Sequence, residues 1–408
     1  MKPTCLPSVA LVVLALSHST STAAAQGPTS PGDPTGKTPG VFGEARSAFT
    51  DQKMFLGEAK FNFENETQIL RTIFWSLDFS QHWTTDTPAW KKLVYQPGMT
   101  NDTARPLAVN KGGSAVFCFD RSQAIQYDTD RAAWEKPFNL TVPFNSLGDP
   151  IADTDQDKFY HLNKDLNAAT EKLQLVLFNP QNKGGQVVSS DMNRLVNSTA
   201  APGVAFPKGV YSSASKSLYF ANMDNPAVKL HQYNVESQSW VPLMEKGDIP
   251  KRRTGQCYVS AAAGKKIIMA GGLRPTSLNV APPGIGTGAA PPTSYNDVLS
   301  EVYIFDIDTS TWSKVGNTPV GFYGSVCAVT GDNLIFYGGY NQYSELPRRF
   351  VYNENKPYIF NLKDNTWVTD FVPAKLGGPG TGGASGASGK AFSVGVVATA
   401  LAAGLALL

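Results

Sequence analysis

Residues 256–272 read QCYVSAAAGKKIIMAGG, and residues 325–339 read SVCAVTGDNLIFYGG. Both stretches consist of two short apolar runs that end in a Gly-Gly pair. A third apolar run and a tryptophan follow each of them, VYIFD with Trp312 in the first copy and YIFN with Trp367 in the second. Short apolar runs bounded by Gly, Asn and Asp are typical of β-strands. The repetition predicts a small sheet that recurs along the chain.

Four weaker copies of this unit precede the two clear ones. They span residues 217–241, 159–188, 115–134 and 53–93, and the copy at 159–188 lacks its tryptophan. No long amphipathic helix pattern occurs between residues 40 and 372. One four-stranded sheet cannot bury both of its faces, whereas sheets packed around a common axis can. We therefore predict an all-β fold, a β-propeller of six four-stranded antiparallel blades, with seven blades as the alternative.

The best-preserved unit carries a characteristic set of residues: Arg253-Thr254-Gly255 before a strand, Gly271-Gly272 after the next strand, and then Tyr303, Asp306 and Trp312. This set resembles the kelch repeat, strongly over residues 250–370 and in an increasingly degenerate form towards the N-terminus. The resemblance implies a kelch-type propeller of the galactose oxidase/kelch-like superfamily. The glycines would permit a tight turn. The repeat tryptophans would pack between neighbouring sheets: Trp240, Trp312 and Trp367.

Both ends of the chain look like processing signals. Met1-Lys2, an apolar run and Ala23-Ala24-Ala25 predict a secretory signal peptide. The terminal apolar tail follows a Gly/Ser-rich stretch, which is typical of a GPI-attachment signal. The attachment candidates are Gly383, Ala384, Ser385 and Gly386. A single C-terminal membrane-spanning helix is the alternative. The predicted organisation is a signal peptide at 1–26, a linker at 27–40, the propeller at 41–372, a stalk with the attachment region at 373–390 and a hydrophobic tail at 391–408.

These signals predict an extracellular address, on the outer face of the plasma membrane or in the cell wall. Four glycosylation sequons agree with that address: Asn65, Asn101, Asn139 and Asn197. The overall organisation resembles fungal GPI-anchored surface proteins of the kelch type. The formal net charge is only +2, from 35 Lys and Arg against 33 Asp and Glu, so nucleic acid is not an expected partner.

Three cysteines remain after the signal peptide, Cys118, Cys257 and Cys327. So few cysteines exclude a disulfide-rich scaffold, so the apolar core has to hold the fold. Cys257 and Cys327 occupy similar points in the two clear units. The sequence favours buried thiols at both positions, with a bridge as the alternative.

Alternate connections of a meander lie at the same end of the sheet. The segment before each first strand and the loop after Gly-Gly should therefore share one face, which includes the loops at 273–295 and 340–356. Loops on a rigid scaffold usually carry function, and Arg and Tyr suit carboxylates, sulfates and sugar hydroxyls. The candidate ligand-binding residues on this face are Arg46, Arg105, Lys208, Arg252, Arg253, Tyr323, Tyr343, Arg348 and Arg349. For each residue, a solvated or repeat-anchoring role is the alternative.

Copper radical oxidases of the galactose-oxidase type are the nearest catalytic proteins of this shape, and they need several histidine ligands. Only His82, His161 and His231 remain here, in three different units, so copper would lack its preferred imidazoles. The sequence favours no catalytic residue, no metal and no cofactor. The predicted function is non-catalytic recognition of an extracellular protein or glycan by a surface module held to the membrane through a GPI lipid. A surface carbohydrate-active enzyme or a copper radical oxidase is the alternative.

Asp153, Asp155 and Asp157 alternate in the manner of a calcium-binding loop. The glycine and the terminal glutamate of an EF-hand loop are absent, and no helix pattern flanks the stretch. The stretch is therefore predicted to be a solvated hairpin turn.

Overall fold

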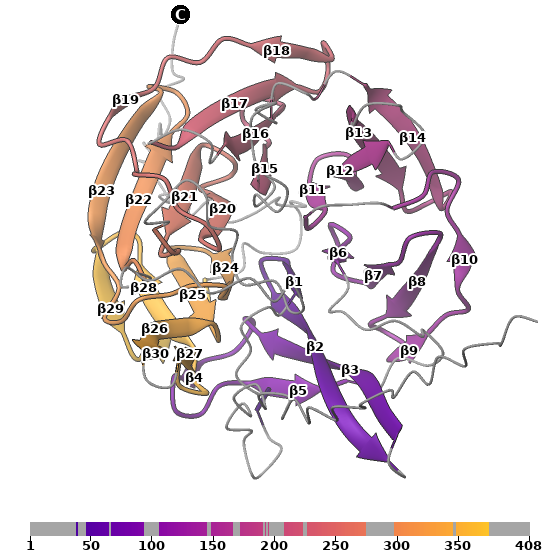
Figure 1. Cartoon of the computed structure of the whole chain (residues 1–408), viewed down its shortest axis with the longest axis horizontal. Helices are drawn as coiled ribbons and strands as arrows, with labels where there is room; N and C mark the ends of the chain where they lie inside the picture. The colour runs from indigo at the N-terminus through magenta and orange to yellow at the C-terminus, as the bar shows by residue number, and fades with distance from the viewer. Residues whose placement is uncertain are drawn as a thin grey trace, which may run out of the picture.

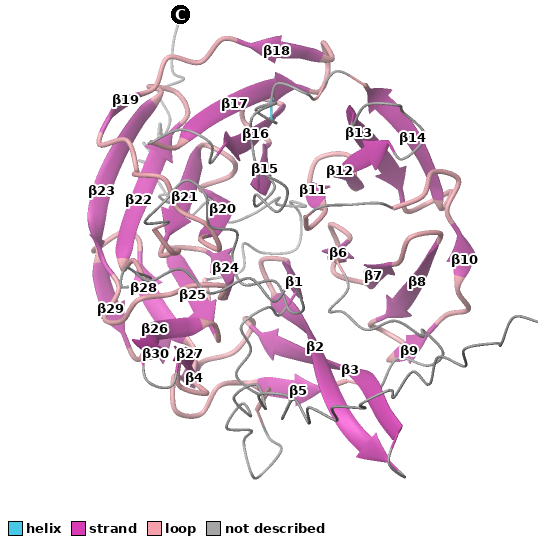
Figure 2. Cartoon of the chain, viewed as in Figure 1, coloured by secondary structure: helices cyan, strands magenta, loops and turns pink. Residues whose placement is uncertain are grey.

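The computed structural model describes residues 38–39, 46–64, 67–93, 106–144, 148–165, 172–190, 192, 195, 208–222, 227–274, 298–345 and 348–374. Strands and their connecting loops make up almost all of this part of the chain (Figure 2). Six sheets stand around a common axis in chain order (Figure 1). The predicted all-β propeller with six blades is confirmed.

In each blade the strands follow one another from the axis outwards, and neighbours pair antiparallel. Blade 1 contains β1 (Arg46–Phe49), β2 (Lys53–Glu64), β3 (Thr67–Asp78) and β5 (Trp90–Lys92). Blade 2 contains β6 (Leu107–Val109), β7 (Ala115–Phe119) and β8 (Gln123–Asp128), with β9 (Ala133–Trp134) and β10 (Phe138–Asn139) both paired to β8. Blade 3 contains β11 (Ile151–Asp153), β12 (Lys158–Asp165), β13 (Lys172–Asn179) and β14 (Gly184–Ser189).

Blade 4 contains β15 (Lys208–Ser212), β16 (Ser217–Asn222), β17 (Lys229–Asn234) and β18 (Ser239–Val241). Blade 5 contains β20 (Cys257–Ala261), β21 (Lys266–Ala270), β22 (Glu301–Asp306) and β23 (Thr311–Asn317), and β19 (Lys246–Gly247) adds a parallel strand to its outer edge. Blade 6 contains β24 (Val326–Thr330), β25 (Asn333–Tyr337), β28 (Tyr358–Asn361) and β29 (Thr366–Val368).

The ring closes in two ways. The inner strands contact one another in the cyclic order β1, β6, β11, β15, β20, β24 and back to β1. After blade 6, β30 (Asp370–Phe371) pairs with β4 (Trp83–Thr84) of blade 1. The Phe371 ring stacks on the Trp83 ring at a centroid distance of 4.7 Å, and both side chains are buried. The last described strand is thereby fastened to the first blade.

The apolar core consists of clusters in the seams between neighbouring blades. The seam of blades 4 and 5, for example, combines Tyr219 and Leu230 with Ile267, Phe305 and Trp312. Trp312 is only 1% exposed. The predicted packing of the repeat tryptophans between sheets is confirmed, because the partly buried Trp240 and Trp367 pack against the neighbouring seam clusters in the same way.

Cys257 and Cys327 form a disulfide. The preference of the sequence for two buried thiols was therefore wrong. Cys118 is buried in β7 and takes no part in this bridge. The physical reason is the curvature of the ring, which places the inner strands β20 and β24 next to each other, with the two Cα atoms 5.9 Å apart. The bridge fastens blade 5 to blade 6.

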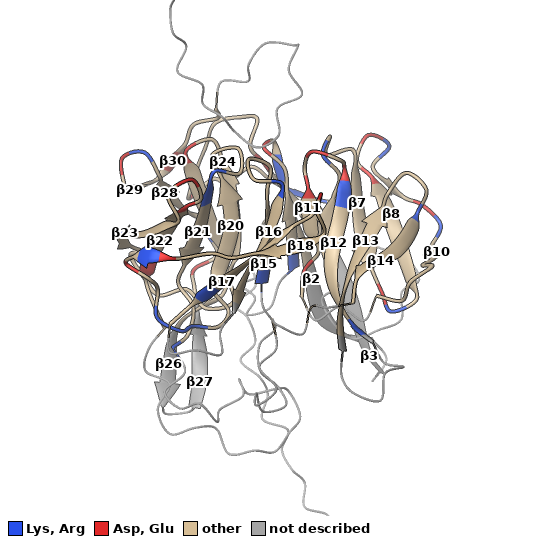
Figure 3. Cartoon of the chain, turned by 90° about the horizontal axis from the view of Figure 1, so that it is seen from above, with Lys and Arg blue, Asp and Glu red and all other residues tan. Residues whose placement is uncertain are grey.

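The two ends of the ring differ. We call the end where the inner strands begin the loop face and the end where they finish the turn face. Apart from residues 79–89, which contain β4, the turn face has short connections, among them the four-residue turns 154–157, 213–216 and 307–310. The residue before the next strand often has a positive φ there, as in Lys216 and Ser310. In Figure 3 the ring is seen from the side, and Lys, Arg, Asp and Glu gather in the connections while the strand interiors are mostly uncharged.

The loop face carries the longer connections, from β12 to β13, β21 to β22 and β25 to β28. The stretch at 340–356 was expected to be a loop, but it contains the antiparallel hairpin of β26 (Tyr340–Glu345) and β27 (Arg348–Tyr352). No helix in the described part of the chain is long and apolar enough to cross a membrane.

Candidate functional site

The loop face unites the two kinds of segment that the sequence places there. The backbone amide of Thr254, before β20, donates to the carbonyl of Leu273, which follows Gly-Gly, and the reverse bond also forms (3.0 and 2.8 Å). Tyr323, before β24, exchanges the same pair of bonds with Tyr340 (3.0 and 2.8 Å). The prediction that these segments share one face is therefore confirmed by the backbone pairing.

Charged side chains from several blades meet on this face close to the axis. The guanidinium of Arg46, at the start of β1, lies 3.3 Å from a carboxylate oxygen of Asp149, which precedes β11. These residues belong to blades 1 and 3, which are not neighbours in the ring. At the start of β15, the Lys208 amine donates to the carbonyl of Gln256 in blade 5 at 2.8 Å. Four of the six blades thus contribute to one polar cluster: Arg46, Asp149, Lys208 and Gln256.

Lys208 reaches solvent with part of its side chain, but its amine is enclosed. Burial lowers the pKa of this amine, the carboxylate of Asp149 opposes that shift, and the guanidinium of Arg46 adds to it. An enclosed ammonium group is unfavourable unless an anion or several hydrogen bonds compensate for its lost hydration. The cluster therefore favours negatively charged groups at this point of the loop face.

Arg253 does not belong to the accessible face, and its assignment as a ligand-binding residue was wrong. Its side chain is fully buried and donates to the carbonyls of Lys251 (3.0 Å) and Gly271 (3.1 Å) and to the carboxylate of Glu301 (2.8 Å). Its guanidinium also lies 5.1 Å from the centroid of the Tyr303 ring. These contacts join the entry of β20 to the Gly-Gly turn and to β22, so Arg253 anchors the repeat.

Arg252 and Tyr323 do reach the loop face. Arg252 is half-buried, and its Nε is enclosed without a hydrogen-bond partner. The half-buried Tyr323 ring stacks on the ring of Tyr340 at 5.8 Å and lies directly against Gly255. Gly255 has φ +62°, and a Cβ on it would lie 2.5 Å from the Tyr323 ring, so only glycine permits this close approach. Arg252 and the tyrosine pair therefore line the part of the loop face that blades 5 and 6 contribute.

Three further predicted residues lie in the hairpin of β26 and β27. Tyr343 pairs with Phe350, Ser344 pairs with Arg349, and Glu345 pairs with Arg348. The backbone thus places Tyr343, Arg348 and Arg349 on the loop-face connection of blade 6, as expected. Arg105 and most of the loop at 273–295 lie outside the described residues.

Most modification sites also lie outside the described residues: Asn65, Asn101, Asn197 and the attachment candidates Gly383, Ala384, Ser385 and Gly386. Asn139 is described, is exposed in β10, and accepts a hydrogen bond from Gln123 at 3.2 Å. A glycan at this position would project from the outer rim of blade 2.

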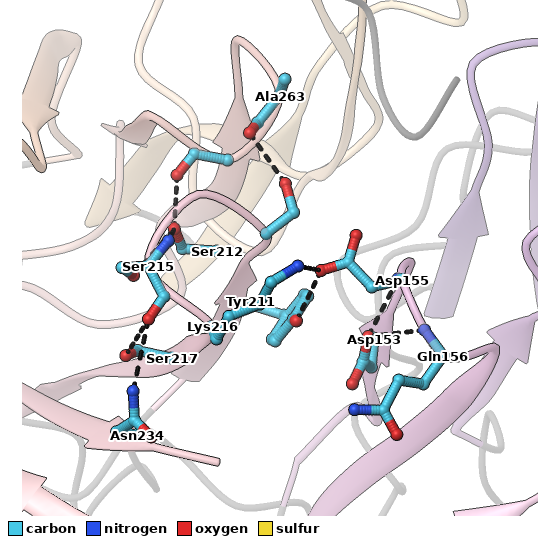
Figure 4. Close-up of polar contacts among 12 residues, drawn as sticks. Asp153, Asp155, Gln156, Tyr211, Ser212, Ser215, Lys216, Ser217, Asn234 and Ala263 are labelled. Carbon is cyan, nitrogen blue, oxygen red and sulfur yellow. Dashed lines mark hydrogen bonds and ion pairs between the residues drawn. The ribbon is translucent and has the colours of Figure 1, made fainter. Parts of the chain in front are cut away.

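The turn face carries the alternating aspartates, in the turn between β11 and β12 (Figure 4). Asp153 accepts the backbone amides of Asp155 and Gln156, and Asp155 accepts Tyr211 Oη at 2.7 Å and Lys216 Nζ at 2.6 Å. The stretch is a hairpin turn, as predicted, although Asp153 is buried rather than solvated. Burial raises the pKa of Asp153. No three His, Cys, Asp or Glu side chains of the described residues gather as metal ligands.

Residues 219–375 match the sequence profile of the KLHDC2/KLHL20/DRC7 Kelch-repeats domain. No curated protein matches the chain. The profile runs from β16 of blade 4 to the end of blade 6, and the ring extends the same blade architecture to the N-terminal half. The chain is a six-bladed kelch β-propeller, and this fold is a common protein-binding module.

The sequence did not identify Asp149 and Gln256 as members of the polar cluster. Gln256 stands directly before β20 and Asp149 stands two residues before β11, while Arg46 and Lys208 are the first residues of β1 and β15. The nearby start of an inner strand is the signal that would have found them. For Asp149 it was hidden because β11 has only three residues and gives little apolar pattern.

Proposed function

We propose that this protein is a secreted surface module, held at the membrane by a GPI lipid, whose loop face recognises an extracellular protein or glycan. The observation that carries the proposal is the difference between the two ends of the ring. The cluster of Arg46, Asp149, Lys208 and Gln256 and the longest connections lie on the loop face, whereas the connections of the turn face are short except for residues 79–89. Variable loops on a rigid scaffold are the usual place for binding.

The place where the chain leaves the propeller also supports the loop face as the recognition surface. After β30 the described chain ends at Ala374, whose methyl group lies against Gly331 in the turn between β24 and β25. That turn belongs to the turn face. A stalk and a lipid anchor that follow Ala374 would leave from the turn face, so the loop face would point away from the membrane.

An oxidising, glycosylating compartment fits the described residues. The disulfide between Cys257 and Cys327 is of the kind that persists outside the cytosol. Asn139, within a sequon, is exposed at the outer edge of blade 2. These features favour the secretory route that the N-terminal segment predicts.

The proposal is tested with cells that express the full chain. Candidate extracellular proteins and glycans of the source are screened for capture, and Arg252→Glu on the loop face is compared with Lys363→Glu in an exposed turn of the turn face. We expect Arg252→Glu to weaken capture at least tenfold, and Lys363→Glu to leave it unchanged. Treatment with a phosphatidylinositol-specific phospholipase should release the protein from the cells.

Two results would contradict the proposal. Equal loss of capture in both variants would show that the loop face is not the recognition surface. Retention of the protein after phospholipase treatment would exclude the GPI anchor and favour a membrane-spanning tail. Surface display and thermal unfolding of both variants serve as the control for folding.

A further inference from the structure

The ion pair of Arg46 and Asp149 joins blades 1 and 3 at the loop-face end of the inner strands. β1 and β11 both contact β6, so the pair links the two blades on either side of blade 2. They share a single contact of 3.3 Å, and their side chains remain 37% and 38% exposed. A solvated pair of this kind is weak, so a competing anion can displace Asp149 at little cost.

Lys208 adds a second cation beside this pair. Its enclosed amine has a hydrogen bond to the neutral carbonyl of Gln256, at 2.8 Å. Within the described residues, no carboxylate lies within ion-pair distance of this amine. The burial-induced decrease in the pKa of Lys208, which Asp149 opposes, agrees with an ammonium group that lacks a close counter-ion. The carboxylate of Asp149 is therefore the counter-ion near both Arg46 and Lys208, but it contacts only Arg46 directly.

The charge balance at this point decides which ligands gain by binding. A ligand with one negative charge can replace Asp149 at Arg46, but this only exchanges one anionic group for another. The charge of Lys208 then remains without a close counter-ion. A ligand with two negative charges neutralises Arg46 and also lies beside Lys208. Charge-assisted hydrogen bonds of this kind are the strong ones in proteins.

We infer that the loop-face end of the ring axis is an anion site for a doubly charged group, formed by Arg46 and Lys208, and that Asp149 is its built-in competitor. The inference deepens the proposed function and rests on it only for the biological ligand. Asp149 competes with singly charged anions for Arg46, so these anions bind weakly. A ligand has to carry more than one negative charge to displace Asp149 with a gain in free energy.

The test uses the purified full-length protein and inorganic sulfate, with acetate as the singly charged probe. The apparent Kd is taken from the saturable part of the rise in unfolding temperature at constant ionic strength, because sulfate also stabilises folded proteins without binding. We expect sulfate to bind the unmodified protein more tightly than acetate. Asp149→Asn should tighten sulfate binding about fivefold, as expected for removal of a surface ion pair worth about 1 kcal/mol.

Two further variants complete the test. Arg46→Gln in the Asp149→Asn background should abolish the saturable response. Asp128→Asn removes the carboxylate of another surface ion pair, with Arg131 at 2.6 Å, and should leave the response to sulfate unchanged. An equal gain in Asp149→Asn and Asp128→Asn would show a general charge effect and overturn the inference. Equal sulfate affinity in Asp149→Asn and the unmodified protein would overturn it as well.

The outcome is separable from that of the proposed function. Saturable sulfate binding that depends on Arg46, together with failed capture of any extracellular partner, would support the site and reject the recognition role assigned to the face. Capture that depends on Arg252, without a sulfate response, would support the recognition role of the loop face and reject the anion site.

Discussion

His161 should make the stability of this propeller depend on pH in the mildly acidic range. The side chain is buried in β12, its ring lies 4.2 Å from that of Phe144, and neither ring nitrogen has a hydrogen-bond partner. Burial lowers the pKa of His161 from 6.5 to about 3. The imidazole therefore stays neutral in the folded protein under conditions where the unfolded chain takes up a proton.

The expected effect follows from linkage. A folded-state pKa below that of the unfolded chain means that the unfolded state binds more protons, so stability falls as the pH drops below 6.5 and continues to fall towards the folded-state value of about 3. At pH 5 the loss from this one residue is about 2 kcal/mol relative to pH 8. That is a sizeable part of the 5–15 kcal/mol that is typical of the free energy of unfolding of a native domain.

The assay is urea denaturation at pH 8 and at pH 5, with the unmodified protein and with His161→Leu. Leucine has a similar size and needs no hydrogen bond, so the variant should fold. We expect the drop in unfolding free energy between the two pH values to be about 2 kcal/mol smaller in His161→Leu than in the unmodified protein. Carboxylates titrate in both proteins and cancel in this comparison. Equal drops would refute the reasoning, because His161 would then titrate alike in the folded and unfolded states.

Three other features of the structure can be tested by substitution. Arg253→Met should cost about 3–5 kcal/mol in chemical denaturation, because it removes the fully buried member of an ion pair and leaves two backbone carbonyls without their donor. Arg252→Gln should stay within about 0.5 kcal/mol, and similar effects of the two would contradict the assignment of Arg253 as an anchor. Serine at both Cys257 and Cys327 should cost about 4 kcal/mol for a loop of 70 residues in the chain-entropy description, and unchanged stability would argue against the bridge. Gly271→Ala should cost about 2 kcal/mol or more, since φ is +63° and its Cβ would meet a carbonyl oxygen at 2.5 Å; calorimetry that shows no loss would disprove this strain.

The sequence predicts the middle strands of the blades well and the inner strands of the first blades poorly. Strands such as β13 and β22 are long apolar runs that any neighbouring sheet would bury, so their local pattern is sufficient. β11 has three residues and β6 also has three, and each becomes a strand because the ring holds it beside its neighbours. The closing pair of β4 and β30 depends in the same way on the whole ring.

In the candidate site, too, the local sequence pattern predicts some features, while others depend on remote parts of the chain. Arg252 and Arg253 are adjacent in a basic run, and only the place of Arg253 in the repeat motif distinguishes the fully buried residue from the half-buried one. The difference arises from Glu301, which is 48 residues away and reaches the Arg253 guanidinium through the sheet of blade 5. Asp149 likewise meets Arg46 across 103 residues. Local patterns predict the face on which a residue lies, and partners remote in the sequence decide its role.

We propose that recognition takes place on the loop face, away from the point where the chain leaves the propeller. Hydrogen–deuterium exchange of the protein with and without a captured ligand would locate the recognition surface. We predict protection in the loop-face segments 251–256, 271–274 and 321–325 and none in the turns 154–157 and 307–310. Protection confined to those turns would contradict the account.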